Sequence, residues 1–208
     1  DVFYYITLYN ENYEMPPLPD TPGLSEAIVE GLYKWADAPA GPSIPATILF
    51  SGTANLAARE AVAELAEHYD VAAELWSATS YKALREEALA AERWNRLHPS
   101  QEAKVPRVAQ ILGDSSGPIT AVSDFMKIVP EQVQRFIPDR TFVPLGTDGM
   151  GRSDTREALR RHFEVDTGHV VLAVLDGLRA DGKIDASVMA DAMARYDIDP
   201  EATDPYLS

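Results

Sequence analysis

The sequence has no cysteine among its 208 residues. This absence excludes a disulfide framework, a thiolate metal site and a cysteine nucleophile. A chain without cysteine suits a reducing compartment, and we expect a cytoplasmic protein. The sequence also lacks any apolar run that approaches the length of a membrane span, so we expect no membrane partner.

Basic residues are also scarce. The chain holds 18 lysine and arginine residues against 33 aspartate and glutamate residues, which gives a formal net charge of −15. Because contacts to phosphates dominate the affinity for nucleic acids, so acidic a chain is a poor candidate for that partner, and we expect no nucleic acid. The acidic residues are spread along the chain, which is typical of a solvated surface.

Nucleotide and metal motifs are missing too. No Walker loop and no dinucleotide fingerprint is present. Of the four histidines, His162 lies one helical turn before Asp166, so these two side chains could share a ligand. No further histidine stands at zinc spacing, and a structural zinc ion needs four well-placed ligands. We therefore assign no catalytic, cofactor-binding or metal residue to this chain.

A glycine-rich loop between a predicted strand and a predicted helix is the most informative motif present. Three glycines in six residues, from Gly146 to Gly151, supply backbone angles that other residues resist. Asp154 and Glu157 have the spacing of an N-cap with a reciprocal carboxylate. Free backbone N–H groups, a helix N-terminus and a basic side chain would then suit an anion or a partner's carboxylate. The candidate residues are Asp148, Gly149, Gly151, Arg152, Ser153 and Asp154.

The same loop has a simpler interpretation, in which the glycines only let a strand turn into a helix. A similar choice arises at residues 51–53 and 77–80, where serine and threonine follow two predicted strands. Open α/β sheets bind ligands at that edge, but serine and threonine are also preferred N-cap residues. The Glu92–Asn95 motif is likewise either a contact surface or an ordinary core anchor, since tryptophan and arginine are enriched in binding hot spots.

The hydrophobic pattern alternates between short buried strands and amphipathic helices. Repeated strand-then-helix units favour an α/β fold, with a mainly parallel five-stranded sheet and helices on both faces. The predicted strands cover residues 46–50, 71–77, 119–123 and 141–145, and the predicted helices cover residues 55–68, 81–95, 131–136, 154–163, 169–180 and 186–195.

The first 45 residues have a different pattern. Residues 2–8 form an apolar, β-branched and aromatic run, which predicts a strand buried on both faces. Several prolines in residues 9–25 indicate an extended linker, and a short helix is predicted over Glu26–Trp35. We therefore divide the chain into residues 1–45 and an α/β domain of residues 46–208. Because a strand at the start needs a sheet from elsewhere, we expect the sequence to be part of a longer chain.

Six motifs, in order along essentially the whole chain, resemble one known family. They are Phe3–Thr7, Asn10–Tyr13, Met15–Pro16, Glu92–Asn95, Leu97–Pro99 and the run from Leu145 through Asp154 to Asp166. The family is the homodimeric bacterial type of pyruvate dehydrogenase E1 component, and the chain resembles its C-terminal domain. The resemblance implies a transketolase C-terminal-domain-like fold for residues 46–208. It also implies that residues 1–45 supply the last strand of a preceding pyrimidine-binding domain, an interdomain linker and a short helix.

The resemblance further implies a parent enzyme that uses thiamine diphosphate and magnesium to decarboxylate pyruvate and acetylate a lipoyl group. Its expected partners are a second copy in a homodimer and the dihydrolipoyl acetyltransferase of a multienzyme complex. The family binds its cofactor in other domains, through a Gly-Asp-Gly motif and a later asparagine. Here Thr147 precedes Asp148 and no asparagine follows Asn95, so we expect no cofactor on this chain alone.

The resemblance therefore implies that this chain supplies structural and dimer-forming surface, and we expect the chain alone to be inactive. The alternative is a self-standing α/β module that binds a small anion through the Gly146–Asp154 loop. The apolar strand predicted at residues 2–8 counts against this alternative, because such a strand needs a sheet that the module itself does not provide.

Overall fold

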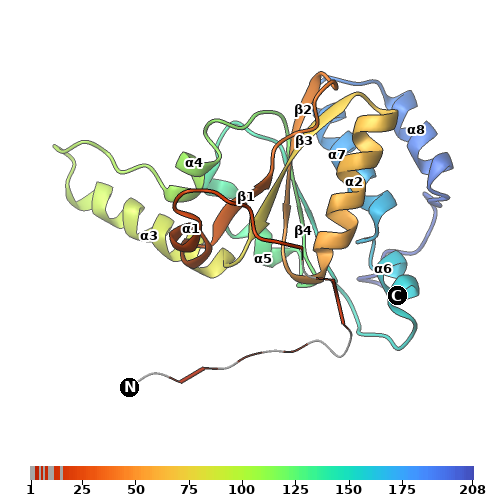
Figure 1. The fold of residues 1–208 in the computed structure, drawn as a ribbon, viewed down its shortest axis with the longest axis horizontal. Helices are drawn as coiled ribbons and strands as arrows, with labels where there is room; N and C mark the ends of the chain where they lie inside the picture. Colours follow the sequence, from red (N-terminus) through yellow and green to blue (C-terminus); the bar gives the residue numbers. More distant parts are fainter. Residues whose placement is uncertain (1–2, 5, 7, 9–11, 15) are drawn as a thin grey trace.

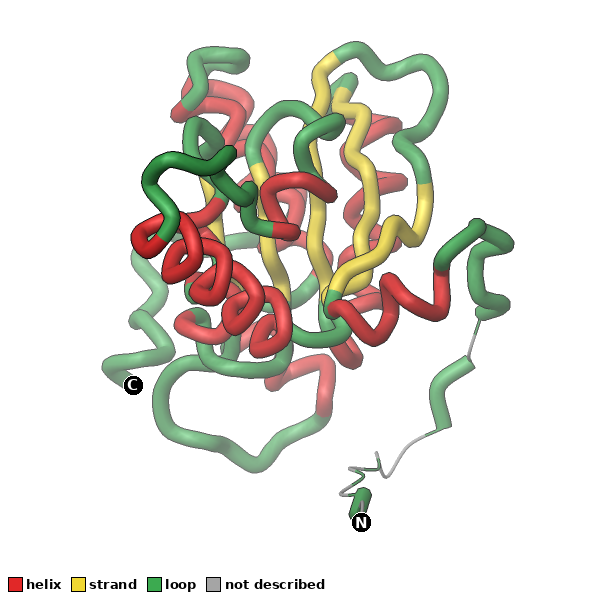
Figure 2. The backbone as a smooth tube through the Cα atoms, turned by 90° about the vertical axis from the view of Figure 1, so that its left-hand side faces the viewer, coloured by secondary structure: helices red, strands yellow, loops and turns green. Residues whose placement is uncertain are grey.

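The computed structural model describes every residue except 1–2, 5, 7, 9–11 and 15. Its centre is a five-stranded sheet in the order β1-β3-β2-β4-β5, and Figure 2 shows the strands side by side. Four strands are parallel and β1 runs antiparallel to β3, which confirms the mainly parallel five-stranded sheet. The strands are β1 Leu32–Ala36, β2 Ile44–Phe50, β3 Val71–Ala78, β4 Ile119–Val122 and β5 Phe142–Leu145.

Burial on both faces explains why the inner strands are mostly apolar. Residues 46–50 of β2 and all four residues of β4 are buried, because helices cover both faces of the sheet. In Figure 1 the sheet stands between two helical layers, which confirms the prediction of helices on both faces. One layer has α2 Asn55–His68, α7 Thr167–Ala180 and α8 Ala186–Arg195, and the other has α3 Tyr81–Leu97, α4 Arg107–Ile111 and α5 Ile128–Glu131.

The predicted helix over Glu26–Trp35 is wrong in its second half. Helix α1 spans only Leu24–Glu30 and ends at Gly31, which has a φ of 105°. The chain then reverses into β1, where Trp35 packs edge-on against Phe50 with ring centroids 5.5 Å apart. The sheet thus includes residues that lie before position 46, while the proposed division of the parent protein at that position stays a prediction.

The predicted opening strand has no pairing partner in the part of the chain that the structure describes. Phe3, Tyr4, Ile6 and Leu8 are exposed and lie outside the sheet, with Phe3 exposed to 92%. The other positions of that predicted strand, residues 2, 5 and 7, lie outside the described residues. Its pairing with a preceding domain therefore stays a prediction.

Two further differences concern short helices. The helix predicted over residues 131–136 is two separate turns, α5 and the 3-10 helix η2 Gln134–Phe136, joined at Gln132 and Val133. Helix α4 was not predicted, because its five residues are too few to give a clear helical period. None of the helices formed by the described residues is long and apolar enough to cross a membrane.

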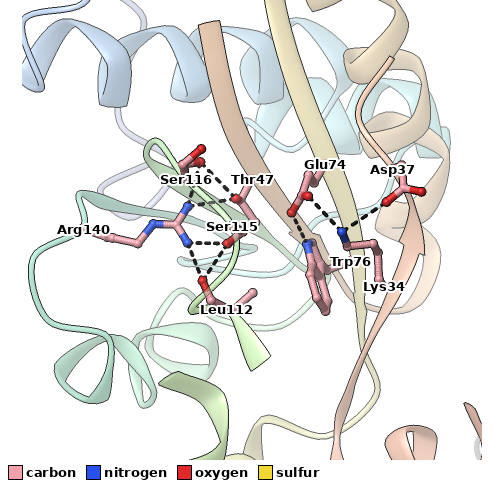
Figure 3. Close-up of polar contacts among 9 residues, drawn as sticks. All are labelled: Lys34, Asp37, Thr47, Glu74, Trp76, Leu112, Ser115, Ser116 and Arg140. Atoms are coloured by element: carbon pink, nitrogen blue, oxygen red, sulfur yellow. Dashed lines mark hydrogen bonds and ion pairs between the residues drawn. The ribbon is translucent and has the colours of Figure 1, made fainter. Parts of the chain in front are cut away.

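Two polar clusters join segments that are distant in the sequence, as Figure 3 shows. The guanidinium of Arg140 donates to the hydroxyls of Ser115 and Thr47, at 2.6 and 2.8 Å. It also donates to the carbonyl of Gly117 at 2.8 Å. Burial lowers the pKa of Arg140 from its ordinary value. Because these contacts precede β4 and β5, Arg140 fixes the end of the sheet at which those strands begin.

The second cluster joins the antiparallel edge strand to its neighbour. Lys34 of β1 binds Glu74 of β3 at 2.9 Å and Asp37 at 3.1 Å, and Glu74 also accepts a bond from the indole of Trp76. Burial alone would lower the pKa of Lys34, but the hydrogen bonds to Glu74 and Asp37 outweigh it and raise the pKa.

Candidate functional site

The glycine-rich loop of residues 146–154 follows β5 and is tied to the loop that follows β4. The backbone N–H of Thr147 donates to the carbonyl of Phe125 at 2.9 Å, and the Thr147 hydroxyl donates to the carbonyl of Asp124 at 2.9 Å. The carboxylate of Asp148 accepts a hydrogen bond from the backbone N–H of Lys127 at 3.0 Å. The first part of the loop is therefore held by its neighbour rather than open to a ligand.

The glycines of the loop have different roles. Gly149 has a φ of 102°, and a Cβ atom there would overlap the carbonyl of Pro205 near the end of the chain. At Gly146 a Cβ atom would overlap the backbone at Phe125. Gly151 has no positive φ, and a Cβ atom there would meet open space. The prediction of backbone angles that other residues resist is therefore confirmed at Gly149 and wrong at Gly146 and Gly151, although close packing still requires glycine at position 146.

The helix after the loop begins two residues later than predicted. Helix α6 spans Arg156–His162, and its N-cap is Thr155, whose hydroxyl accepts a bond from the backbone N–H of Ala158 at 3.3 Å. Asp154 instead accepts a bond from the backbone N–H of Thr155 at 2.7 Å. The predicted capping pair of Asp154 and Glu157 is therefore wrong, because the neighbouring threonine takes the capping position.

The six candidate residues do not converge on one pocket. Gly149, Gly151 and Arg152 line a pocket of about 310 Å³, whereas Arg152, Ser153 and Asp154 line another of about 330 Å³. Asp148 lines neither of these two pockets. Arg152 is exposed and is shared by both. The loop thus presents a cation at the surface, and its residues divide between two pockets.

The larger surroundings of Arg152 are mixed in charge. Asp124 lines the same pocket, and one of its carboxylate oxygens accepts a bond from the Thr53 hydroxyl at 3.4 Å. Arg160 lines this pocket as well, so two basic side chains and one acidic side chain surround it.

The spacing that would let His162 and Asp166 share a ligand is not used in that way in the structure. The carboxylate of Asp166 caps α7 by accepting the backbone N–H of His169 at 3.0 Å, and it also binds the His169 ring at 2.7 Å and Arg161 at 3.2 Å. Burial would raise the pKa of Asp166, but its hydrogen bonds with His169 and Arg161 outweigh burial and lower the pKa. Among the described residues, no three histidine, aspartate or glutamate side chains are grouped to hold a metal ion.

Thiamine diphosphate and its magnesium ion also do not fit the residues present. Asp148, the one carboxylate in a motif similar to the family's metal motif, is engaged with the backbone of Lys127. No asparagine follows Asn95 in the sequence to act as a second ligand. We therefore derive no chemical step through this cofactor on the present chain.

The serine residues that follow β2 and β3 could either cap a helix or bind a ligand, and the structure gives them different roles. Ser80 is the N-cap of α3, since its hydroxyl accepts the backbone N–H of Ala83 at 3.1 Å. Ser51 makes no such capping bond and lines a pocket of about 420 Å³ together with Tyr81 and Gln132. No local signal marks the last two as pocket residues, because Tyr81 follows the pattern of a core residue and Gln132 stands in a polar connection.

The Glu92–Asn95 motif builds the exposed end of α3. The Trp94 ring stacks on His98 at 4.5 Å, and the Lys104 ammonium lies 4.7 Å from the Trp94 ring centroid. The Asn95 side chain binds both the backbone N–H and the carbonyl of Lys104, at 2.7 and 2.9 Å. Trp94 is half-buried under this cover, so the motif stabilises the loop of residues 98–106.

One further motif lies outside the predicted sites. Residues Gly113–Gly117 have the Gly-x-Ser-x-Gly spacing of a nucleophile elbow. In an elbow this pattern follows a strand and opens a helix, but here it precedes β4. Ser115 accepts a bond from Arg140 and donates to the Leu112 carbonyl at 2.9 Å, so it has a structural role.

Comparison with known proteins finds similarity along nearly the whole of this chain to the pyruvate dehydrogenase E1 components of several bacteria. The chain is 43% identical over 205 residues to the pyruvate dehydrogenase E1 component of Pseudomonas aeruginosa, covering 99% of this chain and 23% of that protein. It is 47% identical over 199 residues to the same component of Mycolicibacterium smegmatis, covering 96% of this chain and 21% of that protein. The chain thus spans less than a quarter of the length of these relatives.

A solved structure agrees with the fold. The transketolase from Leishmania mexicana superimposes with a TM-score of 0.50 and 16% identity, over 77% of this chain and 20% of that one. Residues 31–166 match the family described as the transketolase-like TK C-terminal domain. The match begins beside β1, which agrees with the inclusion of that strand in the sheet. On this match, and on its five-stranded α/β architecture, the chain belongs to the transketolase-like C-terminal domain family.

Proposed function

We propose that this chain is the C-terminal domain of a pyruvate dehydrogenase E1 component and supplies structural and dimer-forming surface rather than catalytic residues. The observation that carries the proposal is the similarity to such components over 96–100% of this chain but only 21–23% of theirs. The parent enzyme would decarboxylate pyruvate with thiamine diphosphate and magnesium in the cytoplasm and acetylate the lipoyl group of a dihydrolipoyl acetyltransferase.

The polar contacts of the site support a structural role. Asp148 and Asp166 are carboxylates of the kind that catalysis could use, yet each accepts hydrogen bonds that fix a loop or a helix end. The exposed apolar side chains of Phe3, Tyr4 and Ile6 support a role within a larger assembly, since an exposed apolar group of this kind marks a contact surface. Under the proposal these residues pair with the preceding pyrimidine-binding domain.

The division of roles is tested by activity. We expect the purified 208-residue chain to release no carbon dioxide from pyruvate when thiamine diphosphate and magnesium are supplied. The full-length parent enzyme, assayed in the same way, is the positive control. Turnover that depends on thiamine and is carried out by the chain alone would contradict the assignment.

The dimer-forming surface is tested by association. Sedimentation velocity over a range of concentrations should give dimers or larger species, because apolar surface is left exposed when the other domains are absent. The matched control is a variant in which Phe3, Tyr4 and Ile6 are all replaced by serine, to separate association through this segment from association through the folded domain. A monomer that persists at every concentration in the unaltered chain would argue against a dimer-forming role.

A further inference from the structure

A pocket of about 420 Å³ lies at the end of the sheet where β2, β3 and β4 terminate. The connection after β2 leads through α2 toward β3, while the connection after β4 leads through α5 toward β5, on the other side. The two connections therefore diverge between neighbouring parallel strands. In open α/β sheets such a point leaves a crevice at the carboxyl ends of the strands, and ligands bind there.

Three segments that are distant in the sequence line this pocket. Ser51 comes from the turn after β2, Tyr81 and Lys82 from the first turn of α3, and Phe125 and Gln132 from the connection after β4. No aspartate or glutamate is among the described residues that line it, although the chain as a whole carries a net charge of −15. The pocket therefore offers hydroxyl, amide and ammonium groups in an otherwise acidic protein.

Two hydroxyl groups of the lining are buried without a hydrogen-bond partner among the described residues. They belong to Ser51 and Tyr81, which are only 7% and 4% exposed. Buried polar groups are nearly always paired, because an unpaired one loses its bonds to water and gains nothing in return. Burial also raises the pKa of Tyr81 well above its ordinary value, so its hydroxyl keeps its proton and remains a donor at neutral pH.

The start of α3 adds positive potential to the same pocket. This helix is 17 residues long, and Ser80 caps it by accepting the N–H of Ala83. The N–H groups of Tyr81 and Lys82 precede the first bonds within the helix, so they remain available to a ligand. The Lys82 ammonium is exposed and lies 3.3 Å from Glu86, on the surface beside the pocket.

We propose that this pocket binds the carboxylate or phosphate group of a small molecule, with the first N–H groups of α3 as donors and with the hydroxyls of Ser51 and Tyr81, which are closed to solvent in the free chain, turning to donate when the ligand binds. The inference does not depend on the proposed function, because it rests on the unpaired hydroxyls and on the crevice alone. Carboxylate and phosphate share the same need for convergent donors, so the experiment includes a probe for each.

The test uses hydrogen–deuterium exchange on the full-length parent enzyme and on this chain. Inorganic phosphate and acetate serve as probes, with sodium chloride at equal ionic strength as the control. We expect phosphate or acetate to slow exchange in peptides that cover residues 78–84 and 50–54. The probe with the tighter binding identifies the group that the pocket takes. Unchanged exchange in these peptides with both probes, or protection confined to residues 148–154, would overturn the proposal.

Single substitutions make the test specific to the two hydroxyls. Tyr81→Phe and Ser51→Ala should each weaken binding of the effective probe about three- to tenfold, the range expected for one neutral hydrogen bond. Thr120→Val is the matched control, because Thr120 also has a buried hydroxyl without a partner among the described residues but does not line this pocket. Equal binding by Tyr81→Phe, Ser51→Ala and the control would refute the assignment of donors.

Thermal melting shows whether weaker binding by a variant comes from a loss of folding. Without a probe, Tyr81→Phe should melt at the same temperature as the unaltered chain or higher, because it removes a buried hydroxyl that has no partner among the described residues. With the effective probe, the unaltered chain should gain more in melting temperature than the variant does. A lower melting temperature of Tyr81→Phe without any probe would show that the hydroxyl is paired within the protein, and would count against the proposal.

Discussion

The carboxylate of Asp148 accepts a hydrogen bond from the backbone N–H of Lys127, 21 positions earlier in the sequence, at 3.0 Å. This bond joins the loop after β5 to the start of α5 and gives a structural role to a residue that stands in a metal-like motif. We expect Asp148→Ala to lower the free energy of unfolding by about 1 to 2 kcal/mol, the usual cost of removing a side-chain acceptor from a backbone N–H.

Urea unfolding of the chain provides the measurement for this position. Asp148→Asn keeps a side-chain oxygen in place and is the matched control, so it should lose less than the alanine variant. Equal losses in the two variants would show that the charge, not the acceptor, matters at this position.

Gly149 and Gly151 should respond differently to the same substitution. Gly149→Ala places a Cβ atom on a residue with a φ of 102° and against the Pro205 carbonyl, so it should lose at least about 1 to 2 kcal/mol. Gly151→Ala meets no atom within 4 Å and should leave stability unchanged or slightly raised, since it restricts the unfolded chain. Chemical denaturation of both variants checks the difference, and similar stabilities would contradict it.

The lowered pKa of Asp166 predicts a loss of stability in acid. A carboxyl whose folded-state pKa lies below its ordinary value of 3.8 stabilises the fold above that value. This contribution is lost as the pH falls through the folded-state pKa, because the protonated group no longer attracts Arg161 and His169.

Asp166→Asn isolates this effect, since asparagine is also a good N-cap for α7. The unaltered chain should be more stable than this variant near neutral pH, and the difference should shrink as the pH is lowered below 3.8. Thermal melting over that range is the measurement. A difference that stays constant with pH would show that the carboxylate charge contributes nothing.

Arg140 should be the most sensitive basic residue at the end of the sheet where β4 and β5 begin. Arg140→Met removes bonds to Thr47, Ser115 and Gly117 together and leaves their oxygens without a donor, so we expect a loss of about 3 kcal/mol or more. Arg179→Met is the control, because Arg179 makes an exposed pair with Asp176. Denaturant unfolding should separate the two variants clearly, and equal effects would refute the anchoring role.

Much of the fold could be predicted because local pattern and tertiary environment agree. Helix α2 begins and ends at the predicted residues, Asn55 and His68, since its apolar stripe faces the sheet along its whole length. Helix α8 matches the predicted range in the same way. Strands β2 and β4 are apolar apart from Thr47 and Thr120, because both of their faces are covered.

Strand β1 could not be predicted from local pattern. Leu32 and Trp35 stand three positions apart, which fits a helical stripe as well as a strand. What decides their structure is the turn at Gly31 together with the antiparallel pairing of Leu32 with Ala78, 46 positions later in the sequence. A contact between residues so far apart in the sequence does not change the spacing of apolar residues within β1 itself.

The candidate site could be predicted only in part, for two physical reasons. Asp154 and Thr155 are both good N-cap residues and adjacent, so the local pattern could not decide between them. The approach of Pro205 to Gly149 depends on how the end of the chain folds back, which composition does not report. Tyr81 was missed because it is a core residue that also lines a pocket.

The strand order has a kinetic consequence. Residues 44–78 form one uninterrupted β2–α2–β3 unit whose two strands pair directly, so only a short loop must close to create it. Strand β1 precedes this unit in the chain but pairs only with β3, the last part of the unit in the sequence. The sheet should therefore grow outward from its middle, and the amides of β1 should be the first in the sheet to open in native-state exchange.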